Sequence, residues 1–173
     1  MDIDTLKNAI RDIPDFPKEG IIFKDITPIL ADSALFAGAV DALAEQCAGK
    51  QIDKVAVIDA RGFIFGGALA HKIGAGLIPI RKQGKLPYKT YEQTYDLEYG
   101  SATLAIHVDA CENGKRVLLV DDLLATGGTA AASAELIKQA GGELVGIQFL
   151  IELSFLNGRE KLGGHEVFSA IVF

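Results

Sequence analysis

The chain has 173 residues, of which 49% are hydrophobic, and a formal net charge of −6. This length suits one domain with a buried core, and the acidic charge argues against general binding to nucleic acid or anionic membranes. No apolar run approaches the ~20 residues of a membrane span, and the first residues lack the basic and apolar regions of a signal peptide. Cys47 and Cys111 are too few for a disulfide framework and stand at no metal-ligand spacing. We therefore expect a cytoplasmic protein that binds neither nucleic acid nor membrane.

The first part of the chain is predicted as a helix ending at about Asp12, an extended stretch over residues 16–28, and a second helix from about Ser33. Prolines and a mixed polar and apolar composition mark the extended stretch. Its backbone N–H and C=O groups suit the edge of a flat heterocycle, with Ile22 or Phe23 against the face of the ring. The alternative is a structural N-terminal wrap.

A βαβ pattern follows, with strands over 55–58 and 77–80 joined by a helix over 63–73. Parallel strands end at one edge of a sheet, where open α/β folds bind ligands. The turn after the first strand carries Arg61, whose guanidinium suits a bidentate contact with phosphate. The alternative is a structural ion pair between Arg61 and Asp59.

Residues 82–97 are predicted as a flexible lid loop, because the stretch is polar and has no helical period. Cations stand at its root, namely Arg81, Lys82 and Lys85. They either clamp a pyrophosphate group as the lid closes and excludes water, or form a solvated basic loop.

Two short strands are predicted at 97–99 and 102–108, meeting at Gly100, with a turn at Asn113. Glu98 lies on the return side of the lid. It is either an exposed strand residue or, if the lid folds inward, a carboxylate over the reacting centre that acts as acid or base.

The most informative stretch begins with an apolar strand over 117–120, which is predicted to be buried on both faces. Asp121 and Asp122 close this strand, and their lost hydration requires a metal, a donor or a ligand. A turn of small residues and a helix from about 128 to 140 come next, so that backbone N–H groups and the helix dipole point to one place. The sequence therefore predicts a phosphate site in the turn Ala125, Thr126, Gly127, Gly128 and Thr129.

Two further strands, over 144–153 and 167–173, flank a short helical turn. Strands that alternate with helices predict an α/β fold with a doubly wound, mostly parallel sheet flanked by helices. We expect one domain, with a small hood formed by about 1–30 and 150–173.

The order of the sequence motifs resembles that of the adenine phosphoribosyltransferases, a family of type I phosphoribosyltransferases. The motifs that carry the resemblance are Asp-Phe-Pro at 15–17, Gly-Ile-Ile-Phe-Lys-Asp-Ile-Thr-Pro at 20–28, Asp-Ala-Arg-Gly-Phe at 59–63, Arg-Lys-Gln-Gly-Lys-Leu-Pro at 81–87, Leu-Glu-Tyr-Gly at 97–100 and Val-Asp-Asp-Leu-Leu-Ala-Thr-Gly-Gly-Thr at 120–129. The resemblance implies the type I fold, the conversion of adenine and phosphoribosyl pyrophosphate (PRPP) to AMP and pyrophosphate, Mg²⁺ as cofactor, and a homodimer.

The resemblance also implies individual roles. Residues 125–129 would hold the 5′-phosphate, while Asp121 and Asp122 would face the ribose hydroxyls, directly or through water on Mg²⁺. Arg61, Arg81 and Lys85 would reach the pyrophosphate, and Glu98 would be the acid or base near N7 of adenine. The adenine pocket would be lined by Ile22, Phe23, Lys24 (chiefly through its backbone) and Leu153.

Two other functions stay open on the same fold. One is a phosphoribosyltransferase for a 6-oxopurine, and the other is a regulator that binds PRPP or a nucleotide without catalysis. The chain also departs from the family at Ala60, where many members have serine, so any role of that hydroxyl is absent here.

Overall fold

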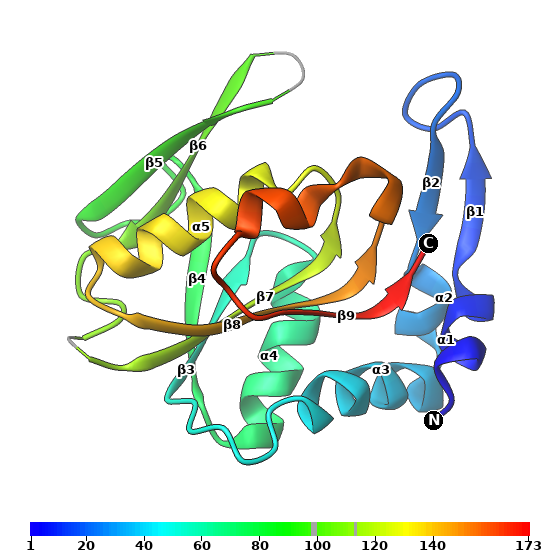
Figure 1. Cartoon of the computed structure of the whole chain (residues 1–173), viewed down its shortest axis with the longest axis horizontal. Helices are drawn as coiled ribbons and strands as arrows, with labels where there is room; N and C mark the ends of the chain where they lie inside the picture. Colours follow the sequence, from blue (N-terminus) through cyan, green and yellow to red (C-terminus); the bar gives the residue numbers. More distant parts are fainter. Residues whose placement is uncertain (98–99, 113) are drawn as a thin grey trace.

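The computed structural model describes residues 1–97, 100–112 and 114–173. A seven-stranded sheet with the order β5-β6-β4-β3-β7-β8-β9 forms its centre (Figure 1). Neighbouring strands pair in parallel from β4 to β9, and a hairpin adds to the β4 edge in antiparallel pairing. The strands are β3 (Lys54–Ile58), β4 (Gly76–Lys82), β5 (Thr90–Asp96), β6 (Ser101–His107), β7 (Arg116–Leu124), β8 (Glu143–Glu152) and β9 (Val167–Val172). The predicted mostly parallel sheet is confirmed.

Helices cover both faces of this sheet, as expected for a doubly wound fold. Helices α3 (Ser33–Glu45) and α4 (Gly62–Ile73) pack on one face with α1 (Ile3–Ala9) and α2 (Thr27–Ala31), around a core that includes Phe65 and Leu118. Helix α5 (Gly128–Gln139) packs on the other face, as does Leu162 of the 3₁₀ turn η2 (Gly158–Leu162). None of the described helices is long and apolar enough to cross a membrane.

Local chemistry explains where these helices begin and how closely they pack. The Asp32 carboxylate caps α3 by accepting hydrogen bonds from the N–H groups of Ala34 and Leu35, both at 2.9 Å. In α4, a methyl group at Gly66 would collide with Val57 of β3. The absent side chain therefore lets the helix lie directly on the sheet.

The strand order places a topological switch point between β3 and β7. These two strands are neighbours, yet the chain leaves β3 toward β4 on one side and β7 toward β8 on the other. The connections therefore diverge and leave a crevice at the carboxyl ends of both strands. Residues 59–62 follow β3, and residues 121–129 comprise the last residues of β7 and the turn after it, so the fold brings the two predicted phosphate-binding segments together.

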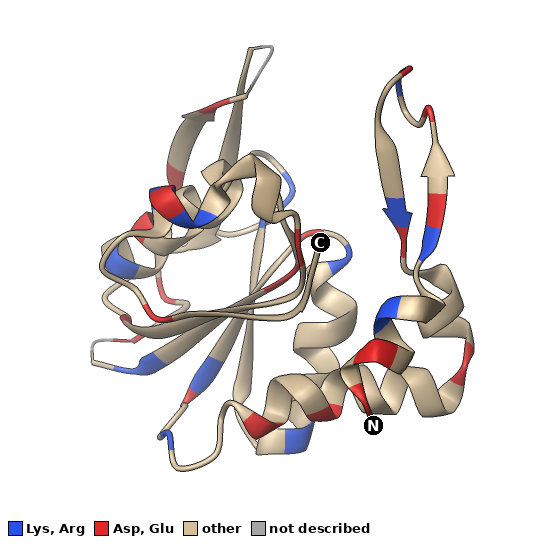
Figure 2. Cartoon of the chain, turned by 45° about the vertical axis from the view of Figure 1, so that its right-hand side comes forward, with Lys and Arg blue, Asp and Glu red and all other residues tan. Residues whose placement is uncertain are grey.

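Two ribbons project on the same side of the molecule in Figure 1. One pairs β1 (Arg11–Pro14) with β2 (Ile22–Asp25), and the other pairs β5 with β6. At the base of the first ribbon, where Figure 2 shows charged residues of both signs, the Lys24 Nζ lies 2.7 Å from Asp12 Oδ1. The N-terminal segment also meets the end of the chain, because the Lys7 ammonium donates to the Val172 carbonyl at 2.6 Å.

The prediction of an irregular lid over residues 82–97 was wrong for its second half, because Thr90–Asp96 is strand β5. Thr90 and Thr94 fall on one face of this strand and Tyr91 and Tyr95 on the other, as the alternation of a strand requires, and this signal was overlooked. The first helix also ends earlier than predicted, at Ala9, and residues 27–31 form the short helix α2. The turn predicted at Asn113 lies outside the described residues.

Candidate active site

Two neighbouring carboxyl groups, one half-buried and one buried, stand near the end of β7. Asp122 is only 5% exposed, and its backbone N–H donates to Asp121 Oδ1 at 2.9 Å. Burial raises the pKa of Asp121 well above its usual range, and the neighbouring Asp122 charge adds to the rise. Burial also raises the pKa of Asp122, although Arg61 opposes that shift. The pair is thus poised to gain from a ligand that brings positive charge or hydroxyl donors.

Arg61 comes from the turn after β3 and is the cation closest to this pair. Its Nε lies 2.8 Å from Asp122 Oδ2. The contact is an ion pair without hydrogen-bond alignment, so this oxygen has no hydrogen-bond donor within the described chain. The guanidinium carbon also lies 5.3 Å from the centre of the Phe23 ring on β2. Arg61 therefore links the acidic pair to the N-terminal ribbon.

The alternative pairing of Arg61 with Asp59 is wrong. Asp59 instead accepts a hydrogen bond from Arg81 Nε at 2.8 Å, and Arg81 Nη1 donates to the Lys85 carbonyl at 3.1 Å. Arg81 is thus occupied by its neighbours, and Lys85 contributes a carbonyl here. The lysine that lines the crevice is Lys82.

The crevice is a cavity of about 370 Å³ between β3, β4, β7 and the β5–β6 hairpin. Its walls combine both charge signs with hydroxyl groups and small apolar side chains. The lining residues are Ile58, Asp59, Ala60, Arg61, Lys82, Tyr95, Leu104, Asp121, Asp122, Leu123 and Thr129. Such a mixture fits a phosphorylated sugar better than a purely apolar ligand.

The turn after β7 has the predicted form of an anion site. Gly127 adopts φ +79°, in the left-handed region, and α5 begins at the next residue. A second hollow of about 80 Å³ is lined by residues 123–130 together with Asp121 and Phe149. Ala125, Thr126, Gly127, Gly128 and Thr129 all line it, so the structure brings the five predicted loop residues around one small space.

Only some of the residues that were predicted to line an adenine pocket lie close to one another. Phe23 lies by Arg61, and the N–H of Leu153 donates to the carbonyl of Leu124, the last residue of β7, at 3.0 Å. The Lys24 ammonium is occupied by Asp12 and lies 3.9 Å from the Phe173 ring centre, so its backbone is the part left for a ligand. Ile22 is 56% exposed and pairs with Pro14 across the β1–β2 ribbon. Glu98 lies outside the described residues.

Tyr95 is a contact of the loop that the sequence interpretation missed. Its hydroxyl accepts a hydrogen bond from Thr129 Oγ1 at 3.0 Å, and its ring packs against Gly128. Tyr95 follows Tyr91 and Gln93 on one face of β5, so correct assignment of the strand would have placed it toward α5.

Comparison with known proteins agrees with this geometry. The phosphoribosyl transferase domain family matches residues 28–163. The adenine phosphoribosyltransferase of Geotalea uraniireducens is 57% identical over 171 residues, which cover 99% of this chain and all of that protein.

The chain belongs to the phosphoribosyltransferase family. Solved structures extend the likeness to three dimensions. The adenine phosphoribosyltransferase of Thermoanaerobacter pseudethanolicus superposes on this phosphoribosyltransferase with a TM-score of 0.97 at 50% identity, over 99% of this chain and 100% of the other. The yeast enzyme, solved with adenine and an imino-altritol bisphosphate, gives a TM-score of 0.92 at 42% identity and 97% coverage of each chain.

Replacing Asp121, whose carboxyl group loses hydration in the fold, with asparagine is expected to stabilise the free form of this phosphoribosyltransferase. At pH 7 we expect Tm to rise by about 2–4 °C for each kcal/mol of relieved desolvation. Between the ordinary carboxyl pKa of 3.8 and the raised value in the fold, only the unfolded chain releases its proton, so stability falls as pH rises. Asp121→Asn should flatten that fall.

Thermal unfolding of both proteins between pH 4 and pH 8 is the measurement. Asp109→Asn, at an exposed position, is the matched control and should leave Tm within about 1 °C. A Tm for Asp121→Asn at or below that of the unchanged protein would contradict the assignment of a costly buried carboxyl.

Proposed function

We propose that the protein is an adenine phosphoribosyltransferase of purine salvage. It transfers the 5-phosphoribosyl group from PRPP to adenine and releases AMP and pyrophosphate. The observation that carries the proposal is Arg61, which contacts Asp122 of the sugar-phosphate crevice and Phe23 of the ribbon beside it. One cation thus joins a polar site to a flat aromatic one, as the two substrates require. The names of the full-length relatives support the same reaction.

The polar site divides among three substrate groups. Residues 125–129 receive the 5′-phosphate through their N–H groups and the start of α5. Asp121 and Asp122 accept hydrogen bonds from the ribose hydroxyls. Arg61 faces the pyrophosphate, together with Lys82, which lines the cavity. Arg81 and Lys85 would reach the pyrophosphate only after a rearrangement. Arg81 would have to give up its hydrogen bond to Asp59 in order to bind the pyrophosphate.

The base site is formed by the β2 strand and the end of β8. Phe23 offers the face of its ring, and the backbone of Lys24 offers hydrogen-bonding groups to the edge of adenine. Ile22 and Leu153 supply apolar surface. Glu98, which lies outside the described residues, is the proposed acid or base near N7 of the purine.

The arrangement suits displacement of pyrophosphate from the anomeric carbon. That carbon gains positive charge as the bond to pyrophosphate breaks, by analogy with glycoside hydrolysis. Asp121 and Asp122 favour the positive charge, and Arg61 favours the negative charge on the leaving group. A closed hairpin keeps water from the cation.

The acidic pair also fits Mg²⁺ that arrives with PRPP. No group of three or more histidine, cysteine or acidic side chains suited to a metal occurs among residues 1–97, 100–112 and 114–173. Mg²⁺ is commonly bound by one or two carboxylates, substrate phosphates and water, and the buried Asp122 Oδ2 has no hydrogen-bond donor. Asp121 and Asp122 would therefore hold the ion directly or through its water ligands. There the ion would neutralise the negative charge of pyrophosphate.

We further propose a homodimer in the cytoplasm. Ile64 of α4 and Leu77 of β4 are large apolar side chains that are 40% and 49% exposed, and a second copy of the chain would cover such surface. Cys47 and Cys111 are buried and unpaired, in keeping with a reducing compartment.

Release of pyrophosphate from PRPP and Mg²⁺ tests the reaction. We expect release with adenine and none above background with hypoxanthine, guanine or xanthine, each supplied separately. Release with a 6-oxopurine would keep the PRPP site and overturn the base assignment. Binding of PRPP without release with any base would favour a regulator.

Glu98→Leu is expected to lower kcat by about 10²–10⁴-fold while the Kd for PRPP stays near its original value. Glu98→Gln separates the two roles, because glutamine still accepts a hydrogen bond from adenine but transfers no proton. Glu92→Gln, on strand β5, is the control and should keep kcat. Unchanged turnover in Glu98→Leu would remove the catalytic role.

Light scattering after size exclusion checks the dimer, and we expect twice the mass of one chain. Leu77→Lys should shift the protein toward the mass of a single chain, because it places a charge in an apolar contact. A single-chain mass for the unchanged protein at high concentration would rule out the dimer.

A further inference from the structure

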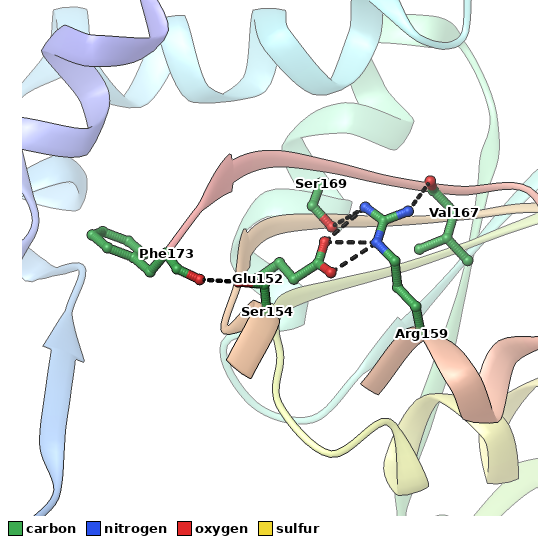
Figure 3. A network of polar contacts seen from close by, with 6 residues as sticks. All are labelled: Glu152, Ser154, Arg159, Val167, Ser169 and Phe173. Atoms are coloured by element: carbon green, nitrogen blue, oxygen red, sulfur yellow. Dashed lines mark hydrogen bonds and ion pairs between the residues drawn. The ribbon is translucent and has the colours of Figure 1, made fainter. Parts of the chain in front are cut away.

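A second buried carboxylate lies outside the crevice, at the end of β8. Glu152 is 5% exposed and ends a strand that is otherwise apolar there. Its partner is Arg159 of η2, as Figure 3 shows. Arg159 Nε donates to both carboxylate oxygens, at 2.7 and 2.9 Å, and Nη2 donates to Oε2 at 2.7 Å. These hydrogen bonds lower the pKa of Glu152, so the pair is ionised.

The same guanidinium also fastens β9. Nη1 donates to the Val167 carbonyl at 2.8 Å, and Nη2 lies 3.2 Å from Ser169 Oγ (Figure 3). All three nitrogens are therefore used, which a lysine could not reproduce because it lacks the planar fork. Arg159 fixes η2 against two strands at once.

The position of η2 matters because Gly158, the residue before Arg159, touches the phosphate loop. A methyl group at Gly158 would collide with the Ala125 carbonyl, and one at Gly127 would collide with the Gly158 carbonyl. The two backbones are thus in direct contact. A shift of η2 would move the loop or open a gap behind it.

Glu152 has an equally direct neighbour on its other side. Leu153 follows it and donates its N–H to the Leu124 carbonyl, at the last residue of β7. The Glu152 carbonyl accepts the Phe173 N–H at 2.9 Å, and the Phe173 ring lies over Lys24. Glu152 is therefore adjacent both to the segment proposed to bind the base and to the strand that leads into the phosphate loop.

We propose that Arg159, held by Glu152, is a positioning residue that fixes the 5′-phosphate loop through Gly158. The inference rests on the proposed function, because it takes residues 125–129 as the phosphate site. Arg159 touches no substrate. Its role is to hold the loop N–H groups in the geometry that a phosphate requires, where a small displacement has a large cost.

Arg159→Lys is the test, and ribose 5-phosphate is the probe, because it needs the phosphate loop and no base. We expect its Kd by calorimetry, and the KM for PRPP, to rise by about 10- to 100-fold, while kcat changes much less. Arg116→Lys is the matched control. Arg116 Nη1 lies 2.8 Å from Glu143 Oε1, where β7 and β8 begin and far from their carboxyl ends, and this variant should keep both constants.

Each other outcome counts against the inference. Unchanged Kd and KM in a folded Arg159→Lys protein would overturn it, and so would equal losses in Arg116→Lys, which would indicate general destabilisation. If Arg159→Lys does not fold, Glu152→Gln, which keeps the shape of the carboxylate, decides in its place; failure of both to fold would make the pair a scaffold only. Absence of ribose 5-phosphate binding in the unchanged protein would instead refute the proposed function.

Discussion

The structure depends on the desolvation of two neighbouring carboxyl groups at the end of β7. Folding removes water from Asp121 and Asp122 and places one cation, Arg61, within ion-pair distance. The cost is only partly offset, since the pKa of each acid stays raised. The free protein therefore holds the crevice in an electrostatically incomplete state, and ligands that bring donors or cations complete it. The uncompensated charge of the two carboxyl groups thus lowers the stability of the free protein, while the same charge favours ligand binding.

The order of the strands determines which charged groups lie beside the two carboxyl groups. Arg61 is about sixty residues away in sequence, yet β3 and β7 are adjacent and parallel, so their following turns meet. The N-terminal ribbon then brings the Phe23 ring within 5.3 Å of the guanidinium carbon. A sugar-phosphate site and an aromatic surface thus come from three distant segments. Their common element is a single arginine with two different contacts.

Residues whose chemistry is local were predictable from sequence, and residues whose partners are distant were less so. The apolar strand, the acids and the glycine turn at 117–129 form one continuous pattern. The structure has them in the predicted order, although β7 does not end at the acids and continues to Leu124. The partner of Asp59 could not be read in this way, because two arginines follow neighbouring strands and only the packing selects Arg81. Strand β5 was missed because its polar residues suggested a loop. Glu152 did carry a signal, namely a carboxylate within an apolar strand, which demands a partner.

The tyrosines of this chain give it a property that its fold alone does not suggest. It has no tryptophan and four tyrosines, and these are Tyr88, Tyr91, Tyr95 and Tyr99. All of the intrinsic emission from tyrosine therefore arises in one short segment, at and beside strand β5. Tyr95 meets the hydroxyl of Thr129 in the phosphate loop, so the binding of a phosphate there would change the surroundings of a fluorophore. The chain thus carries its own optical reporter of the hairpin, and stopped-flow experiments can follow that segment without a label.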